Sequence, residues 1–198
     1  MKEYTAKDIR NVGVFGHGGE GKTTLTEAMM LNAGLTDRLG KVENGTTVTD
    51  FDPEEISRGI SINMALAPFE WKDVKVNIID ARGCFDFYGE VAAAMALADS
   101  ALIVVGAGSG PVVGTEKAMA MCKKDHKARM IVINQMDREN ANFDKVMAEI
   151  SAKFGPSVVP IQLPIIEGGV FKGYVDIVHM SAKLFDGKGE KETEIPAA

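Results

Sequence analysis

The feature that most constrains this chain is a glycine-rich run near its amino end: Gly16, His17, Gly18, Gly19, Glu20, Gly21, Lys22, Thr23 and Thr24. A short apolar run, residues 11–16, precedes it, and residues 22–33 contain few helix breakers. This order predicts a strand, a loop and a helix. In that context the run fits a phosphate loop, whose backbone N–H groups converge on phosphate oxygens at the positive end of the helix.

Two side chains of this loop have specific expected roles in binding a nucleotide. We expect Lys22 to span the β- and γ-phosphates of a nucleotide and the Thr23 hydroxyl to hold Mg²⁺. The alternative is a glycine-rich turn without a ligand. The position between a strand and a helix favours the phosphate loop.

The rest of the chain alternates between strand and helix patterns. We predict strands over residues 61–71, 74–80, 101–105 and 130–134, and helices over residues 89–98, 114–124 and 143–154. The first two strands form a hairpin through Lys72 and Asp73, and the alternation predicts an α/β fold with a mostly parallel sheet. Residues 34–58 are polar and without period, so we expect a functional loop that acts as a switch.

The pattern changes after the last predicted helix, where Pro156, Pro160 and Pro164 interrupt regular structure. We expect residues 1–155 to form the nucleotide-binding domain and residues 156–198 to form part of a β-rich subdomain. The charged tract over residues 186–194 is interpreted as a solvated tail.

Charge and cysteine content narrow the class of protein. The net charge is −6, which disfavours a surface built to neutralise nucleic-acid phosphates, so we expect no DNA partner. The two cysteines, Cys84 and Cys122, lack metal-ligand spacing and are too few for a disulfide framework. With no apolar leader and no membrane-length segment, we predict a cytoplasmic monomer without membrane contact.

Two acidic residues stand where open α/β sheets bind ligands, at the carboxyl ends of predicted strands. Asp80 ends one strand shortly before Gly83, as expected of a second carboxylate directed at Mg²⁺ beside a mobile loop, although such an Asp is also a common turn residue. Asp137 closes the motif Asn134-Gln135-Met136-Asp137 after another strand. Its carboxylate can accept hydrogen bonds from guanine N1–H and the exocyclic amine, which adenine does not offer, so Asp137 favours GTP over ATP.

The chain resembles elongation factor G and its close paralogues among the translation GTPases. The stretches IRNVGVFGHGGEGKTTLTEAM, GTTVTDFDPEEISRGISIN, VNIIDARGCFDF, NQMDRENANFDK and FKGYVDIVHM carry the resemblance across nearly the whole chain. It implies a P-loop GTPase domain that binds GTP or GDP with Mg²⁺ and works on the ribosome, followed by the start of an inserted subdomain. It also implies that Ser61 ligates Mg²⁺, with Ser in place of the usual Thr.

Three departures from the family cluster at the predicted site. Cys84 stands where the family commonly has a water-positioning histidine, and a thiol is a weak hydrogen-bond donor. Gly19 stands where relatives often have an Asp that is associated with a monovalent cation at the phosphates. Gln135 stands where the family has a Lys whose aliphatic stem covers the guanine ring. Groups for binding phosphate and metal remain, whereas groups serving hydrolysis or base packing have changed.

These observations lead to one expected function and two alternatives. We expect GTP hydrolysis with Lys22, Gly83 and Cys84 at the reacting phosphate, to the extent that Cys84 can replace histidine. The alternatives are a module that binds GTP with little or no hydrolysis and an ATP-using P-loop enzyme. The resemblance further implies that the chain is a fragment, and that the Ser-Ala-Lys run at residues 181–183 belongs to the inserted subdomain rather than to the guanine site.

Overall fold

The computed structural model describes residues 2–50, 52–58, 63–81, 83, 88–187 and 189–195. Contacts divide the chain into two compact units. The first consists of Met1–Gly106 and Pro111–Asn134, and the second of Ala107–Gly110 and Gln135–Ala198. The domain boundary at residue 155 stays a prediction.

The first unit is built on a five-stranded sheet with the order β2-β3-β1-β4-β5. Its strands are β1 (Ile9–Gly16), β2 (Ala65–Trp71), β3 (Val74–Asp80), β4 (Ser100–Gly106) and β5 (Ala128–Asn134). The pairs β1–β3, β1–β4 and β4–β5 are parallel, and only β2 runs antiparallel, to β3. This sheet confirms the predicted α/β fold, including the hairpin at Lys72 and Asp73. Strand β2 begins at Ala65, later than predicted, while Ser61 and Ile62 lie outside the described residues.

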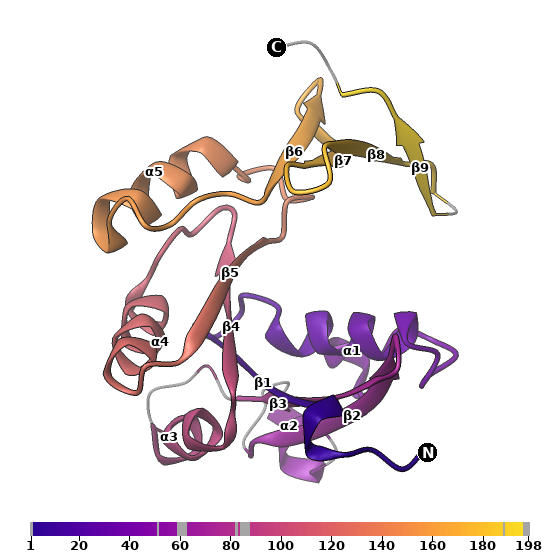
Figure 1. Cartoon of the computed structure of the whole chain (residues 1–198), viewed down its shortest axis with the longest axis vertical. Helices are drawn as coiled ribbons and strands as arrows, with labels where there is room; N and C mark the ends of the chain where they lie inside the picture. The colour runs from indigo at the N-terminus through magenta and orange to yellow at the C-terminus, as the bar shows by residue number, and fades with distance from the viewer. Residues whose placement is uncertain are drawn as a thin grey trace. The chain divides into compact units, whose positions relative to one another are not determined.

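Helices cover both faces of this sheet. They are α1 (Lys22–Asn32), α3 (Tyr88–Leu97) and α4 (Val113–Lys124), with the short α2 (Pro53–Arg58) and the 3₁₀ turns η1 (Ala6–Asp8) and η2 (Val42–Asn44). Figure 1 shows α1 on one face and α3 and α4 on the other. Because both faces are covered, the central strand β4 is a near-continuous apolar run that is buried from its second residue onward.

The core on the α1 side joins the helix to the sheet. Met30 of α1 packs with Val14, Ile78 and Val104, and each of these four residues is at most 2% exposed. Burying one such aliphatic side chain stabilises the fold by about 1.5–3 kcal/mol. This packing fixes α1, and with it the first turn that carries Lys22 and Thr23, against the sheet.

The predicted irregular loop over residues 34–58 is wrong at its end, where α2 forms. Asp52 accepts a hydrogen bond from the Glu54 N–H at 2.8 Å, and the Glu55 carboxylate accepts one from the Asp52 N–H at 3.1 Å. Pro53 occupies the first helical position, where a missing N–H costs nothing. Reciprocal capping of this kind starts a helix without an apolar period, which explains why the periodicity did not indicate it.

The second unit contains α5 (Phe143–Phe154) and a four-stranded antiparallel sheet of β6 (Gln162–Glu167), β7 (Val170–Asp176), β8 (Ser181–Phe185) and β9 (Glu190–Thr193). The sheet confirms the predicted β-rich segment. The solvated-tail interpretation is wrong over Glu190–Thr193, because β9 pairs with β8. Glu190 accepts hydrogen bonds from Lys183 Nζ at 2.9 Å and from the Tyr174 hydroxyl at 3.2 Å.

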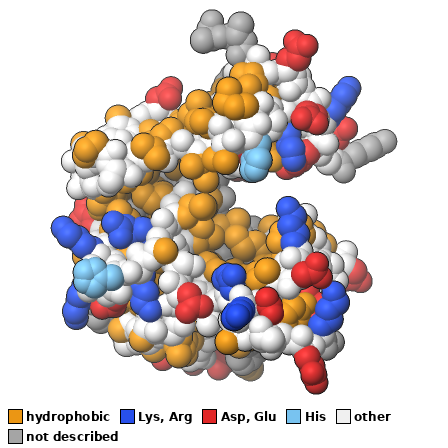
Figure 2. Space-filling view, viewed as in Figure 1, with side chains coloured by type: hydrophobic (Ala, Val, Ile, Leu, Met, Phe, Trp, Pro, Cys, Tyr) orange, Lys and Arg blue, Asp and Glu red, His pale blue; other side chains and the backbone are white. Residues whose placement is uncertain are grey.

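On the face drawn in Figure 2, Lys and Arg side chains are interspersed with Asp and Glu. Several apolar side chains of the second unit are exposed, among them Val159, Val178 and Met180. In the described part of the chain, no helix has the length and apolar character needed to cross a membrane.

Candidate nucleotide site

The glycine-rich run forms the connection between β1 and α1, as predicted. Gly19 and Gly21 both have φ of 82°, a left-handed conformation that other residues adopt only with strain. Gly21 is also the residue that caps the amino end of α1. The loop therefore bends tightly and leads into the positive end of α1, with Thr23 and Thr24 in the first helical turn.

Contacts with β4 and within the loop itself hold the loop in place. Gly16 pairs with Val104 of β4, and a Cβ on Gly16 would collide with the Val104 carbonyl oxygen. The Lys22 ammonium donates a 2.7 Å hydrogen bond to the His17 carbonyl oxygen. Gly18 and Gly19 are exposed, whereas Glu20 and Lys22 are buried. The loop is thus anchored at its ends and open at its middle.

Asp80, at the end of β3, lies beside the first turn of α1. Its side chain is 4% exposed, and burial raises the pKa of its carboxyl group to about 6. A hydrogen bond with Thr23 and the charge of Lys22 act in the opposite direction and lower that pKa. Among the described residues, Asp80 Oδ2 has no hydrogen-bond partner. A buried carboxylate oxygen without a partner is unfavourable unless a ligand or cation satisfies it.

These groups fit Mg²⁺ bound together with a nucleotide. The Thr23 hydroxyl and the Asp80 carboxylate would supply hard oxygen ligands, which Mg²⁺ prefers while keeping waters and binding phosphates. The described ranges contain no group of three or more His, Cys, Asp and Glu that could hold a metal, so they offer no cage made of protein ligands alone. The third predicted ligand, Ser61, lies outside the described residues.

Gly83 approaches the phosphate loop closely. A Cβ on Gly83 would lie 2.6 Å from the Gly18 nitrogen and 2.7 Å from the His17 carbonyl carbon, closer than van der Waals contact permits. Only glycine fits there in this conformation. The structure therefore brings predicted residues Gly83, Gly18 and Lys22 together, while Cys84 lies outside the described residues.

The predicted guanine motif begins at the end of β5. The Asn134 side-chain amide donates a 2.8 Å hydrogen bond to the Glu20 carbonyl oxygen of the loop. Gln135 has a φ of 61° and Asp137 is exposed, both in the second unit. Recognition of the base by Gln135 and Asp137 stays a prediction. Ser181–Phe185 forms β8, so the Ser-Ala-Lys run belongs to the second sheet.

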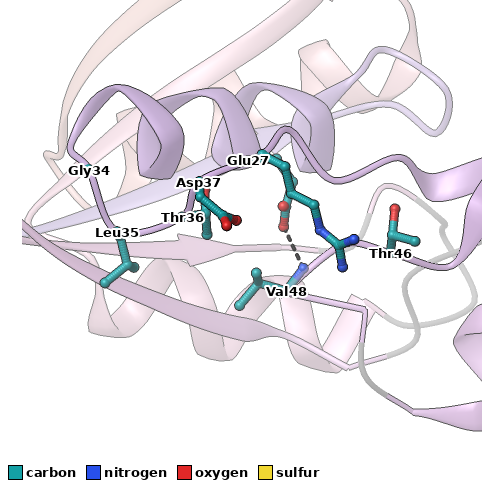
Figure 3. Close-up of a pocket in the computed structure, with 8 residues that line it drawn as sticks. Glu27, Gly34, Leu35, Thr36, Asp37, Thr46 and Val48 are labelled. Atoms are coloured by element: carbon teal, nitrogen blue, oxygen red, sulfur yellow. Dashed lines mark hydrogen bonds between the residues drawn. The ribbon is translucent and has the colours of Figure 1, made fainter.

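Sequence reasoning missed Glu27, which lies on α1 and is 1% exposed. Its Oε1 accepts hydrogen bonds from the Val48 N–H at 2.7 Å and from the Thr49 N–H at 3.4 Å; Figure 3 shows the bond to Val48. The available sequence signal was a Glu on the predicted helix four residues after Thr23, but its partners are backbone N–H groups 21 and 22 residues further along the chain. Glu27 ties the helix that carries Thr23 to the predicted switch segment.

A pocket of about 430 Å³ opens beside Glu27. Its lining residues are Glu27, Gly34, Leu35, Thr36, Asp37, Arg38, Thr46 and Val48. None of the predicted nucleotide or metal residues lines it. The pocket is therefore separate from the contacts predicted for a nucleotide.

The fold and the loop define a P-loop nucleotide-binding domain. The family model described as Elongation factor Tu GTP binding domain matches residues 7–192, and the chain belongs to this family. Its relatives identify it as an elongation factor G-like translation GTPase domain.

Two similar curated proteins are both named "Ribosome-releasing factor 2, mitochondrial". The one from Anopheles gambiae is 36% identical over 184 residues, covering 93% of this chain and 25% of that protein. The one from Culex quinquefasciatus is 36% identical over 187 residues, covering 94% of this chain and 25% of that protein. A crystal structure of a protein from Thermus thermophilus matches with a TM-score of 0.90 and 37% identity, covering 95% of this chain and 28% of that one. The chain spans about a quarter of the length of the curated relatives.

Proposed function

We propose that this domain binds GTP and GDP with Mg²⁺ and hydrolyses GTP during a ribosomal step of translation, acting as a cytoplasmic monomer. The observation that carries the proposal is the buried Asp80 carboxylate. It lies close to Lys22 and Thr23 and keeps one oxygen without a partner among the described residues. A cation bound to the nucleotide would coordinate this carboxylate oxygen beside the phosphate loop and so give it a partner.

The reaction is the in-line attack of water on the γ-phosphate. A bond forms between the water oxygen and phosphorus as the bond to the β-γ bridging oxygen breaks. GDP leaves with that oxygen and its electron pair, and both protons of the water leave with the inorganic phosphate as H₂PO₄⁻. The loop amides and Lys22 stabilise the negative charge on the phosphate oxygens. Thr23, Ser61 and Asp80 would hold Mg²⁺, which when bound neutralises part of that charge.

Cys84 sets the expected rate of hydrolysis. A positioned acid or base contributes about 10²- to 10⁴-fold to such a reaction, and a thiol orients water poorly. We therefore expect turnover to fall by that factor below a variant carrying histidine. The competing function is GTP binding without hydrolysis, in which Cys84→His and Cys84→Ala would leave turnover unchanged.

Phosphate release from GTP tests this function. It is measured in single turnover with and without ribosomes on the complete protein, for the wild type, Cys84→His and Lys22→Ala. Lys127→Ala is a matched control, because Lys127 Nζ also donates to a backbone carbonyl, that of Ala98 at 2.6 Å, away from the loop. We expect ribosome-stimulated release that Cys84→His raises, Lys22→Ala abolishes and Lys127→Ala leaves unchanged. Absence of release in every protein would contradict hydrolysis.

A further inference from the structure

Gly114, the second residue of α4, lies against the phosphate loop. A Cβ on Gly114 would be 2.7 Å from the His17 Cα, 2.8 Å from its nitrogen and 2.9 Å from its Cβ. Two of these three atoms belong to the backbone, so rotation of a side chain cannot relieve the collision. The φ of Gly114 is outside the positive range, and the backbone there suits any residue. Glycine is required at this position for space, not for conformation.

Helix α4 cannot easily move away from the loop. It packs against β1 and β4, and Thr115 and Cys122 on its inner face are fully buried. Close-packed interiors yield little when volume is added. A side chain at position 114 would therefore displace His17 rather than the helix.

The same stretch of the loop has a second close contact. Gly83 approaches the His17 carbonyl carbon and the Gly18 nitrogen, and Lys22 Nζ donates to the His17 carbonyl oxygen at 2.7 Å. Gly114 of α4 and Gly83 thus both lie against the backbone at His17, whose carbonyl oxygen accepts a hydrogen bond from the loop's own lysine. A Cβ on either glycine would therefore force the loop backbone or the glycine's own segment to shift.

We propose that Gly114 is a positioning residue for the phosphate loop. By carrying no side chain, it lets the first turn of α4 support His17, so that the neighbouring loop amides face the phosphates. This inference rests on the proposed nucleotide binding. Charge-assisted hydrogen bonds to phosphate weaken as donor and acceptor separate, so displacing several of them should reduce GDP affinity by at least about 10-fold.

Two glycine variants separate this role from a general effect of alanine in a helix. Gly114→Ala is compared with Gly89→Ala, because Gly89 is the second residue of α3 and a Cβ there meets nothing within 4 Å. Titration with fluorescent GDP should show a loss of at least about 10-fold for Gly114→Ala and less than about twofold for Gly89→Ala. In the nucleotide-free chain, amide NMR shifts at residues 17–21 should move in Gly114→Ala only.

The outcomes are decisive in each case. Wild-type GDP affinity in Gly114→Ala, or weakened binding with unchanged amide shifts at residues 17–21, would overturn the proposal. Failure of Gly114→Ala to fold would also overturn it, because a contact that only positions the loop cannot control the whole fold. If the wild type binds no GDP, the proposed function fails, and the amide shifts of the nucleotide-free chain still decide whether Gly114 positions the loop.

Discussion

The Asn134 side-chain amide donates a 2.8 Å hydrogen bond to the Glu20 carbonyl oxygen, which joins the end of β5 to the phosphate loop. The first residue of the predicted guanine motif therefore supports the phosphate site. Residues 114 positions apart in the chain meet because β1 and β5 both flank β4 in the parallel sheet. Through this contact Asn134, although it lies on β5, supports the conformation of the loop.

Removing this contact should weaken nucleotide binding. One net hydrogen bond is worth about 1 kcal/mol, so Asn134→Ala should reduce GDP affinity by about fivefold or more. Asn77→Ala is the control, because Asn77 Nδ2 donates a hydrogen bond of the same 2.8 Å length to Asn11 in the same sheet. Fluorescent GDP titration should show a loss for Asn134→Ala alone. Equal losses in both variants would assign the effect to the sheet rather than to the loop.

Asp80→Asn should separate stability from metal-dependent binding. Burial makes the charged carboxylate unfavourable in the nucleotide-free fold, and its Oδ2 has no partner among the described residues. The neutral amide removes that cost, so the Tm without ligand should stay equal or rise at pH 7. The rise in Tm on adding Mg²⁺ and GDP should disappear, since a ligand stabilises only the state it binds. An undiminished rise in Asp80→Asn would exclude Asp80 from the metal site.

Glu27 should stabilise the segment that contains Val48 and Thr49. Glu27→Ala leaves two backbone N–H groups without their acceptor, and each such loss costs about 1–3 kcal/mol. Glu27→Gln keeps an acceptor oxygen of similar reach and should retain most of the free energy of unfolding. Urea denaturation of the three chains measures the difference. If Gln is as damaging as Ala, the charge of Glu27 and not its hydrogen bonds supports the segment.

Asp137→Asn should change base selectivity. The substitution replaces an acceptor by a donor toward guanine N1–H, so GDP affinity should fall by about 10-fold or more while xanthosine diphosphate binds better. Asp144→Asn, another exposed Asp of the second unit, removes the same charge outside the motif. Titration with both diphosphates compares the variants. Unchanged GDP affinity in Asp137→Asn would remove this residue from base recognition.

The parts of the fold that local sequence determines were predictable. The phosphate loop follows from glycines in left-handed conformations between a strand and a helix, and the parallel sheet follows from alternating patterns. Helix α2 was not predictable from periodicity, because six residues held by the capping of Asp52 and Glu55 show no apolar face. Strand β9 was missed because its charged side chains resemble those of a solvated tail, although its backbone pairs with β8.

The sequence correctly indicated that Lys22 and Asp80 lie near each other, whereas their roles toward a nucleotide stay predictions. The site was not predictable where a contact depends on backbone groups brought together by the fold. Glu27 binds N–H groups that any residue could supply, and Asn134 binds a carbonyl oxygen. Gly114 is required by the path of α4 past His17, which no local pattern encodes.

Competition between GDP and ADP tests whether this chain is a guanine-nucleotide-binding domain. The wild-type chain is titrated with fluorescent GDP in the presence of Mg²⁺, and unlabelled GDP and ADP are then used to displace it. We expect saturable binding of the fluorescent GDP, which unlabelled GDP displaces at least about 100-fold more effectively than ADP, because only guanine satisfies the acceptor at Asp137. Absence of GDP binding, or equal displacement by ADP, would contradict this expectation.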